Sequence, residues 1–146
     1  MVYMQSLLHL ADISNPFKQW TMCKYWSDRV FAEFYDQGDR EKKEGLPVSM
    51  LCDRDSTWQD ESSVNFIDFI VCPFLFASTE AFPELIPACE ILAENRQRWT
   101  DLTIERIKQT YTGEEDASKR KEEVEKWVSK SESFRTKLAE LRTTCD

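Results

Sequence analysis

Apolar residues recur at helical spacing along the first part of the chain. Residues 3–13 form a short apolar run that Pro16 should end, because proline cannot continue a helix. Residues 20–37 predict an amphipathic helix that Gly38 closes, with apolar positions at steps of four: Met22, Trp26, Val30 and Phe34. Residues 40–60 are charged and turn-prone, which predicts a connection with little helix.

The middle of the chain carries its most apolar segment. Ser62 or Ser63 is expected to cap a helix that runs to about Thr79. This helix is apolar nearly all round, which predicts burial on several sides. Pro73 should kink it, and Asp68 inside it needs a partner, because an unpaired buried charge is unfavourable.

Two helices are expected after this segment. The first enters near Pro83 and Pro87 and extends to about Thr110. The second lies within residues 114–146, where a seam alternates steps of three and four: Val124, Trp127, Ser131, Phe134, Leu138 and Leu141. This helix either packs on its own domain or mediates self-association. The predicted fold class is therefore all-α, a bundle of about five helices.

Composition supports a packed helical domain. The chain has 146 residues, 41% hydrophobic and 12% aromatic, with only 3 glycines and 5 prolines. A net charge of −8 argues against non-specific binding to nucleic acid or to anionic membranes. No stretch is expected to be long enough to span a membrane, since Asn65, Asp68 and Pro73 interrupt residues 64–77.

The cysteines and the first residues bear on the compartment. There are 5 cysteines, an odd number, and no Cys-x-x-Cys pair occurs. Cys23, Cys72 and Cys89 fall in apolar segments, which predicts buried reduced thiols in a cytoplasmic protein. Residues 1–5 lack the basic start of a signal peptide.

Candidate chemistry gathers between Leu7 and Pro16, an apolar stretch that predicts a buried helical turn. His9 and Asp12 are three residues apart and would share one face of a helix. A carboxylate in such surroundings must be paired, hydrogen-bonded, protonated or metal-bound. The alternative is that Asp12 caps the next turn.

Residues 9–16 resemble the His-x-Ala-Asp-Ile/Leu-Ser-Asn-Pro signature of class I cyclic nucleotide phosphodiesterases. Further blocks match in order: residues 26–29 with 33–39, residues 45–49 with 52–54, and residues 66–71. The resemblance covers roughly residues 3–102. It implies the C-terminal part of the family's catalytic domain, an HD-type multi-helix bundle, over residues 1–112, followed by a charged C-terminal helix over residues 113–146.

The family hydrolyses 3',5'-cyclic nucleotides, cAMP or cGMP, with zinc and magnesium or manganese bound by two histidines and two aspartates. A further histidine is the general acid. The resemblance implies Asp12 as a metal ligand, and His9 as a residue that packs near the site or supports a ligand. This chain has 1 histidine, and a catalytic zinc usually has three protein ligands. The chain alone is therefore expected to be inactive.

The resemblance also implies a nucleotide pocket. Phe66 matches the stacking phenylalanine, Asn15 lies near the nucleotide, and the apolar pocket positions are Val30, Phe34 and Leu51. Without the resemblance, these apolar residues would be interpreted as core. The family's purine-reading glutamine falls at Ser63, whose hydroxyl is too short for the paired contact of an amide. Gln59, one turn earlier, is an alternative, and the choice between cAMP and cGMP stays open.

Alternatives to an enzyme part remain. The chain could be a non-catalytic nucleotide-binding or helical interaction module, a degenerate phosphodiesterase. Its acidic loop residues predict a solvated loop rather than a calcium site: Asp53, Asp55, Asp60 and Glu61. If the apolar faces of residues 3–13 and 64–77 are left bare, we expect self-association or a covering partner.

Overall fold

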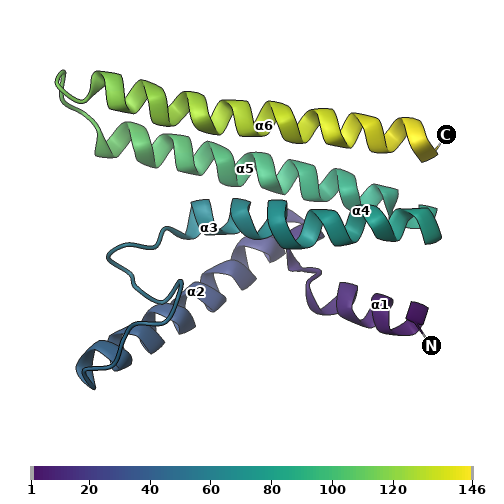
Figure 1. Ribbon diagram of the computed structural model, residues 1–146, viewed down its shortest axis with the longest axis horizontal. Coiled ribbons are helices and arrows are strands. Elements are labelled where there is room, and N and C mark those ends of the chain that lie inside the picture. Colours follow the sequence, from purple (N-terminus) through teal and green to yellow (C-terminus); the bar gives the residue numbers. More distant parts are fainter. Residues whose placement is uncertain (1, 146) are drawn as a thin grey trace.

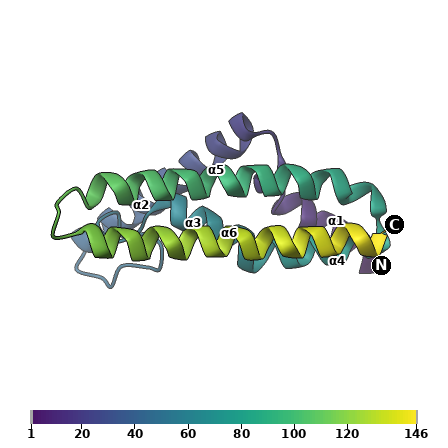
Figure 2. The same ribbon diagram turned by 90° about the horizontal axis from the view of Figure 1, so that it is seen from above.

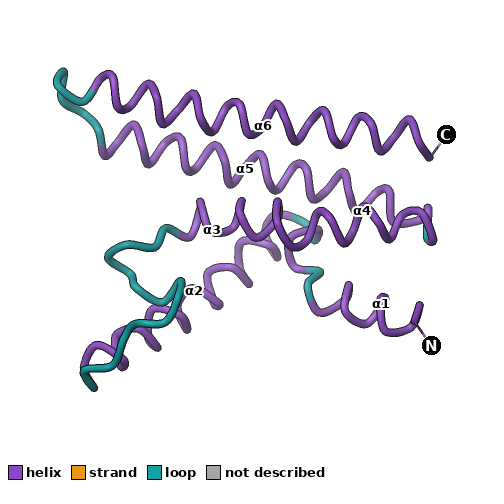
Figure 3. Tube along the Cα trace, in the orientation of Figure 1, coloured by secondary structure: helices purple, strands orange, loops and turns teal. Residues whose placement is uncertain are grey.

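A computed structural model describes residues 2–145, and every regular element among them is helical (Figure 3). Helices α5 (Ile86–Thr110) and α6 (Ala117–Cys145) lie side by side and antiparallel (Figures 1 and 2). The segments α3 (Gln59–Phe66), η2 (Ile67–Val71) and α4 (Cys72–Ala81) follow one another as one rod that packs on α5. The predicted all-α fold class is confirmed.

The first elements lie on the other side of this rod (Figure 1). They are α1 (Val2–Asp12), the 3-10 turn η1 (Asn15–Phe17) and the long helix α2 (Trp20–Lys43). Helix α2 points away from the rod, and the loop of residues 44–58 runs back along it (Figure 1). The short turn η3 (Pro83–Leu85) joins α4 to α5.

A buried arginine on α5 joins this helix to the rod and to α6. The Nε and Nη2 atoms of Arg96 on α5 donate to the two carboxylate oxygens of Asp68 at 2.6 and 2.8 Å. Its Nη1 atom donates to the Ser131 hydroxyl at 3.2 Å, and its guanidinium lies 4.6 Å from the centre of the Phe134 ring. The partner predicted for Asp68 is therefore found.

The seam of α6 packs against its own chain. Trp127, Ser131 and Phe134 are buried, and Val124 and Leu138 pack against the core. Leu141, the last position of the seam, lies outside the residues whose side chains the structure describes. Of the two interpretations of this helix, the structure has the one in which it covers its own domain.

Helix α2 does not end at Gly38, which corrects the sequence prediction. The helix continues to Lys43, and Gly38 is buried inside it. A methyl group at this position would lie 2.7 Å from the carbonyl carbon of Cys52 and closer still to the carbonyl oxygen. Glycine is therefore required because the loop backbone crosses the helix here, and not because the helix stops.

The start of the rod also differs from the prediction. Helix α3 begins at Gln59, so Ser62 and Ser63 lie inside it and do not cap it. The Nε atom of Arg106 on α5 donates to the Asp60 carboxylate at 2.9 Å, and its Nη2 atom bonds to Glu61. These ion pairs hold the first turn of α3 against α5.

The remaining acids of the loop are also paired. Lys42 donates to the carboxylates of Asp53 and Asp55, at 2.6 and 2.7 Å. These side chains stay in contact with solvent, as the predicted solvated loop requires, and the ion pairs hold the loop to α2.

Pro73 follows a π-helical turn. Residues 67–71 adopt this wider turn, and the Cys72 N–H donates to the Ile67 carbonyl five residues earlier. Such a turn is a usual way to fit an irregularity into a continuous helix.

The prediction that no stretch is long enough to span a membrane is wrong for the rod on the criteria of length and composition. Residues 59–81 form a helical stretch of 23 residues that is long and apolar enough, by length and composition alone, to cross a membrane. Core helices of other proteins pass the same test. Here the stretch contributes Val64, Val71 and Leu75 to the core, with each at 0% exposure.

The predicted buried thiols are found: Cys23, Cys72 and Cys89 are all buried. The Cys145 side chain lies outside those that the structure describes. The cytoplasmic location inferred from these thiols stays a prediction.

Two apolar faces are open, on α1 and on the rod. Tyr3, Met4 and Leu8 are exposed by 66%, 78% and 67%, and Phe69 by 72%. The prediction of a buried turn from Leu7 onward is therefore wrong for most of α1, where Leu10 is the buried apolar side chain. The reason is that α1 meets the rest of the chain on one side only, chiefly through α4.

Candidate functional site

One pocket, here called the central pocket, brings together most of the predicted site residues. It has a volume of about 380 Å³ and lies among the end of α1, η1, α2, the loop and the start of the rod. Its lining includes Asp12, the candidate metal ligand, and all residues predicted to contact nucleotide: Asn15, Val30, Phe34, Leu51, Ser63 and Phe66. Residues from distant parts of the sequence therefore face one cavity.

The apolar stripe of α2 forms a wall of the central pocket. Trp26 and Val30 are exposed by 42% and 40%, and both line it together with Phe34. Cys23 and Phe31 also line the pocket, but both are buried. The predicted stripe at steps of four is thus mainly a pocket wall, and half-open apolar walls of this kind favour a ligand that covers them.

Leu51 also lines the central pocket, and it has an unusual backbone conformation. Its φ angle is +69°, in the left-handed region that non-glycine residues seldom adopt. The turn is closed by a hydrogen bond from the Cys52 N–H to the Ser49 carbonyl at 3.0 Å. Because Gly38 lets the Cys52 backbone approach α2 so closely, it also sets the position of Leu51. Backbone strain of this kind is often found at binding sites.

The polar signature residues occupy different positions. Asp12 is exposed at the edge of the central pocket. The residue at the N-cap of η1 is Ser14, so the structure does not support the interpretation of Asp12 as its cap. His9 packs its ring edge-to-face on Phe74 at 5.1 Å and is not among the residues that line the pocket. For His9 the structure thus supports the packing interpretation.

A buried asparagine positions the turn that carries Asn15. The Nδ2 atom of Asn95 on α5 donates to the carbonyl oxygens of Pro16 and Lys18, at 2.8 and 2.6 Å. Trp99, one turn later, lines the pocket floor and lies 5.0 Å from Trp20. Neither Asn95 nor Trp99 was predicted as a site residue, although both fall on the apolar face of α5 that includes Leu92.

The central pocket has one polar wall, between α2 and α3. Ser27, Ser62 and Ser63 line it, and the Ser27 and Ser63 hydroxyl oxygens are 3.2 Å apart. The Gln59 Nε2 atom donates to the Ser27 hydroxyl at 2.9 Å and to the Asp28 carboxylate at 2.7 Å. Gln59 is therefore held behind the wall and does not reach into the pocket as the sequence alternative required.

The Asp28 side chain, which contacts the polar wall through Gln59, is a charged carboxylate. Partial burial tends to raise the pKa of Asp28, but hydrogen bonds from Lys24 and Gln59 outweigh it and lower that pKa below its ordinary value. Asp28 is thus a carboxylate that accepts hydrogen bonds at neutral pH. Within the pocket itself, burial raises the pKa of the Cys23 thiol, which stays protonated.

The described residues do not by themselves fit a divalent metal. Among them, no group of three or more histidine, cysteine, aspartate and glutamate side chains is placed to hold a metal ion. A catalytic zinc usually needs three protein ligands, and Asp12 is the one carboxylate among the described residues that line the central pocket. The residues present therefore suit the binding of an apolar ring better than the binding of a metal.

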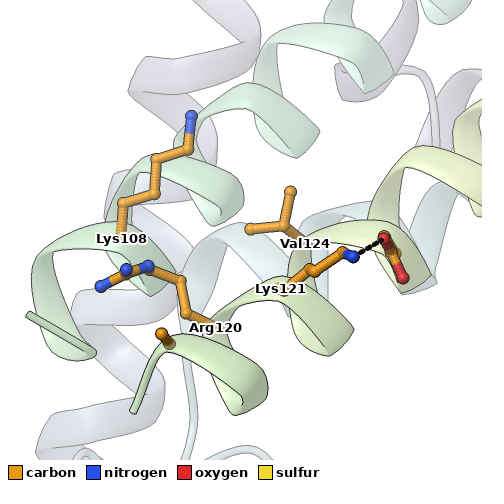
Figure 4. Close-up of a pocket in the computed structure, with 6 residues that line it drawn as sticks. Lys108, Arg120, Lys121 and Val124 are labelled. Carbon is orange, nitrogen blue, oxygen red and sulfur yellow. Dashed lines mark ion pairs between the residues drawn. The ribbon is translucent and has the colours of Figure 1, made fainter. Parts of the chain in front are cut away.

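A second hollow lies between α5 and α6 near their connecting turn (Figure 4). Its volume is about 570 Å³, and its lining includes Lys108, Arg120 and Lys121. Lys121 pairs with Glu125 at 3.8 Å, and Arg120 donates to the Tyr111 carbonyl at 2.5 Å. None of the predicted site residues lines this hollow, so the central pocket is the better candidate.

Comparison with known proteins finds one family. A family model described as 3'5'-cyclic nucleotide phosphodiesterase matches residues 1–92. The mouse 3',5'-cyclic-AMP phosphodiesterase 4C is 38% identical over 95 residues, which is 64% of this chain. The bovine dual specificity calcium/calmodulin-dependent 3',5'-cyclic nucleotide phosphodiesterase 1B is 50% identical over 74 residues, or 51% of this chain.

A nematode relative is similar to the same extent. The probable 3',5'-cyclic-AMP phosphodiesterase pde-4 of Caenorhabditis elegans is 39% identical over 95 residues. The matched part of this chain spans 14% of the length of each of these three relatives. The family match includes the whole polar signature and the pocket residues up to Ile67, but it ends before Asn95 and Trp99 on α5.

Proposed function

The chain belongs to the 3',5'-cyclic nucleotide phosphodiesterase family, and on this premise we propose that its central pocket binds the purine base of a 3',5'-cyclic nucleotide. The observation that carries the proposal is that Phe66, Asn15 and the apolar residues Val30, Phe34 and Leu51 line one cavity. The base would stack on Phe66, which is 41% exposed at the pocket. The complete site would hydrolyse cAMP or cGMP to the 5'-nucleotide.

The apolar walls support a flat, apolar ligand. Val30, Leu51 and Phe66 are each exposed by about two fifths, at 40%, 41% and 41%, and they face a shared space. Covering such surfaces gains about 25 cal/mol for each Å² removed from water. A purine ring has two apolar faces and a polar edge, which matches apolar walls with the serine hydroxyls on one side.

Asp12 is our proposed metal ligand, but this chain supplies it alone. Zinc and magnesium or manganese stay predictions from the resemblance, because the described residues hold no complete ligand set. The other ligands and the general acid would have to come from outside this 146-residue chain, which has 1 histidine. We therefore expect the purified chain to bind cyclic nucleotide without hydrolysing it. Turnover by the chain in zinc and magnesium would contradict this expectation.

A titration with cyclic nucleotide tests the proposed binding. Trp26 and Trp99 line the central pocket, so tryptophan fluorescence should change when cAMP or cGMP enters. The Phe66→Ala variant should weaken binding about tenfold or more, since stacking on an aromatic side chain contributes roughly 1–3 kcal/mol per base. Equal affinity in the variant would contradict the proposal.

The chain offers a matched control. Phe69 lies on the same rod, is 72% exposed and is not among the residues that line the central pocket. Phe69→Ala removes a side chain of the same kind, so it should leave the affinity unchanged. If both variants weaken binding equally, the effect reports on the rod and not on stacking in the pocket.

A further inference from the structure

The polar wall of the central pocket contains a hydroxyl pair with a defined chemistry. We propose that Ser27 and Ser63 together recognise the edge of the purine, and that the pair accepts 6-amino and 6-oxo purines with similar affinity. The inference rests on the proposed function, because it concerns the base that binds in this pocket. Three observations carry it: the lining, the spacing of the two hydroxyls, and the direction of the hydrogen bonds behind them.

Asp28 determines the direction of the hydrogen bonds that Gln59 makes. A carboxylate only accepts hydrogen bonds, so the amide group of Gln59 that faces Asp28 at 2.7 Å must be its NH₂ group. The same nitrogen lies 2.9 Å from the Ser27 hydroxyl oxygen and donates to it. One of the two lone pairs of Ser27 is therefore occupied by Gln59, whatever the pocket contains.

Two arrangements of the hydroxyl protons are then possible, since the oxygens of Ser27 and Ser63 are 3.2 Å apart and either can donate. If Ser27 donates to Ser63, the Ser63 proton is left for a ligand, and the remaining lone pair of Ser27 can accept. If Ser63 donates to Ser27, the Ser27 proton is left, and Ser63 accepts. Each arrangement thus offers one donor and one acceptor, on neighbouring oxygens.

This property matches both purine types. The edge of adenine presents the N6 amino donor beside the N1 acceptor, and the edge of guanine presents the O6 acceptor beside the N1–H donor. Each edge needs one donor and one acceptor from the protein, in opposite order. Rotation of two hydroxyl protons exchanges the order without movement of a heavy atom, so the pair can serve either base.

The test compares three cyclic nucleotides on the unaltered chain by calorimetry: cAMP, cGMP and the 3',5'-cyclic monophosphate of purine riboside, which has no group at C6. We expect dissociation constants for cAMP and cGMP within about threefold of each other. The third nucleotide should bind about 3- to 10-fold more weakly, because it lacks one of the two hydrogen bonds. This comparison needs no variant and therefore does not depend on the folding of one.

Variants test the two hydroxyls directly. Ser27→Ala and Ser63→Ala should each weaken cAMP and cGMP binding about 3- to 10-fold, because each variant removes one of the two neighbouring oxygens and with it one hydrogen bond to the base. Ser133→Ala, an exposed position on α6, is the control and should bind as the parent chain does. Circular dichroism confirms that each variant is folded.

The outcomes separate this inference from the proposed function. If no cyclic nucleotide binds the unaltered chain, the proposed function fails, and the inference with it. If cyclic nucleotides bind but cAMP and cGMP differ by more than about 30-fold, the hydroxyl pair does not read both edges and the inference alone is overturned. It is overturned as well if folded Ser27→Ala and Ser63→Ala bind both nucleotides like the parent chain.

Discussion

The buried arginine on α5 provides the sharpest test of how the long helices are held together. Replacing Arg96 by methionine keeps much of the length of the side chain but removes the charge. The Asp68 carboxylate, which is 19% exposed, would then lose both of its bonds at 2.6 and 2.8 Å. Removing one partner of a buried pair destabilises by about 3–5 kcal/mol, because the other charge stays buried without compensation.

Urea denaturation followed by circular dichroism measures this change. With a slope of about 2 kcal/mol per molar urea, the midpoint of Arg96→Met should fall by about 2 M. The double variant Arg96→Met/Asp68→Leu should recover most of the loss, because neither charge remains. A cycle of these variants isolates the energy of the pair.

A surface pair is the control for this experiment. Lys121 and Glu125 are 3.8 Å apart with side chains that are 77% and 66% exposed. Exposed pairs contribute about 0–1 kcal/mol, so Lys121→Met should shift the midpoint little. If Arg96→Met shifts the midpoint no more than Lys121→Met does, the buried ion pair does not join the three helices and the reasoning is refuted.

Four further outcomes are expected. Gly38→Ala should lower the free energy of unfolding by about 1–3 kcal/mol in a thermal denaturation experiment, because the added methyl group meets a loop carbonyl. Gly113→Ala is the control and should stay near the value of the parent chain. Asn95→Ala should lower it by about 2 kcal/mol through the loss of two hydrogen bonds, and should weaken cyclic nucleotide binding, because these bonds position the η1 turn. Burial raises the pKa of Cys72 from its ordinary 9.0 to about 12. The unfolded chain therefore loses this proton first, so Cys72 alone should lower stability by about 1.4 kcal/mol per pH unit between pH 9 and 12, and Cys72→Ala should reduce the slope by this share. Finally, the open apolar faces should produce self-association in sedimentation experiments at high concentration, which Phe69→Glu should reduce; a monomer at every concentration would contradict this.

The spacing of apolar residues predicted which segments are helical better than it predicted where each helix ends. The helix expected to extend from near Pro83 to about Thr110 is found as α5, and it buries an apolar face that includes Leu92 and Trp99. The end of α2 was misplaced because Gly38 is compatible with either a helix end or a close backbone approach. The close approach depends on a loop contact with Cys52 that sequence spacing does not contain.

In the candidate site, too, the features that depend on tertiary packing could not be predicted from sequence spacing. Phe66 and Val30 could be assigned to the pocket from a resemblance, whereas their apolar character alone would have placed them in the core. The φ angle of Leu51 and the bonds from Asn95 to the η1 turn depend on tertiary packing. The sequence did contain one indication of these contacts. Asn95 and Arg96 are polar residues on an otherwise apolar helical face, and buried polar residues require partners.

Intermolecular nuclear Overhauser effects between bound cAMP and the labelled chain would locate the purine without any variant. We expect contacts from the purine H2 and H8 protons to the Phe66 ring and to the methyl groups of Val30 and Leu51, which line the central pocket. Contacts instead to Lys108 and Val124, in the hollow between α5 and α6, would contradict the proposed binding of the base in the central pocket.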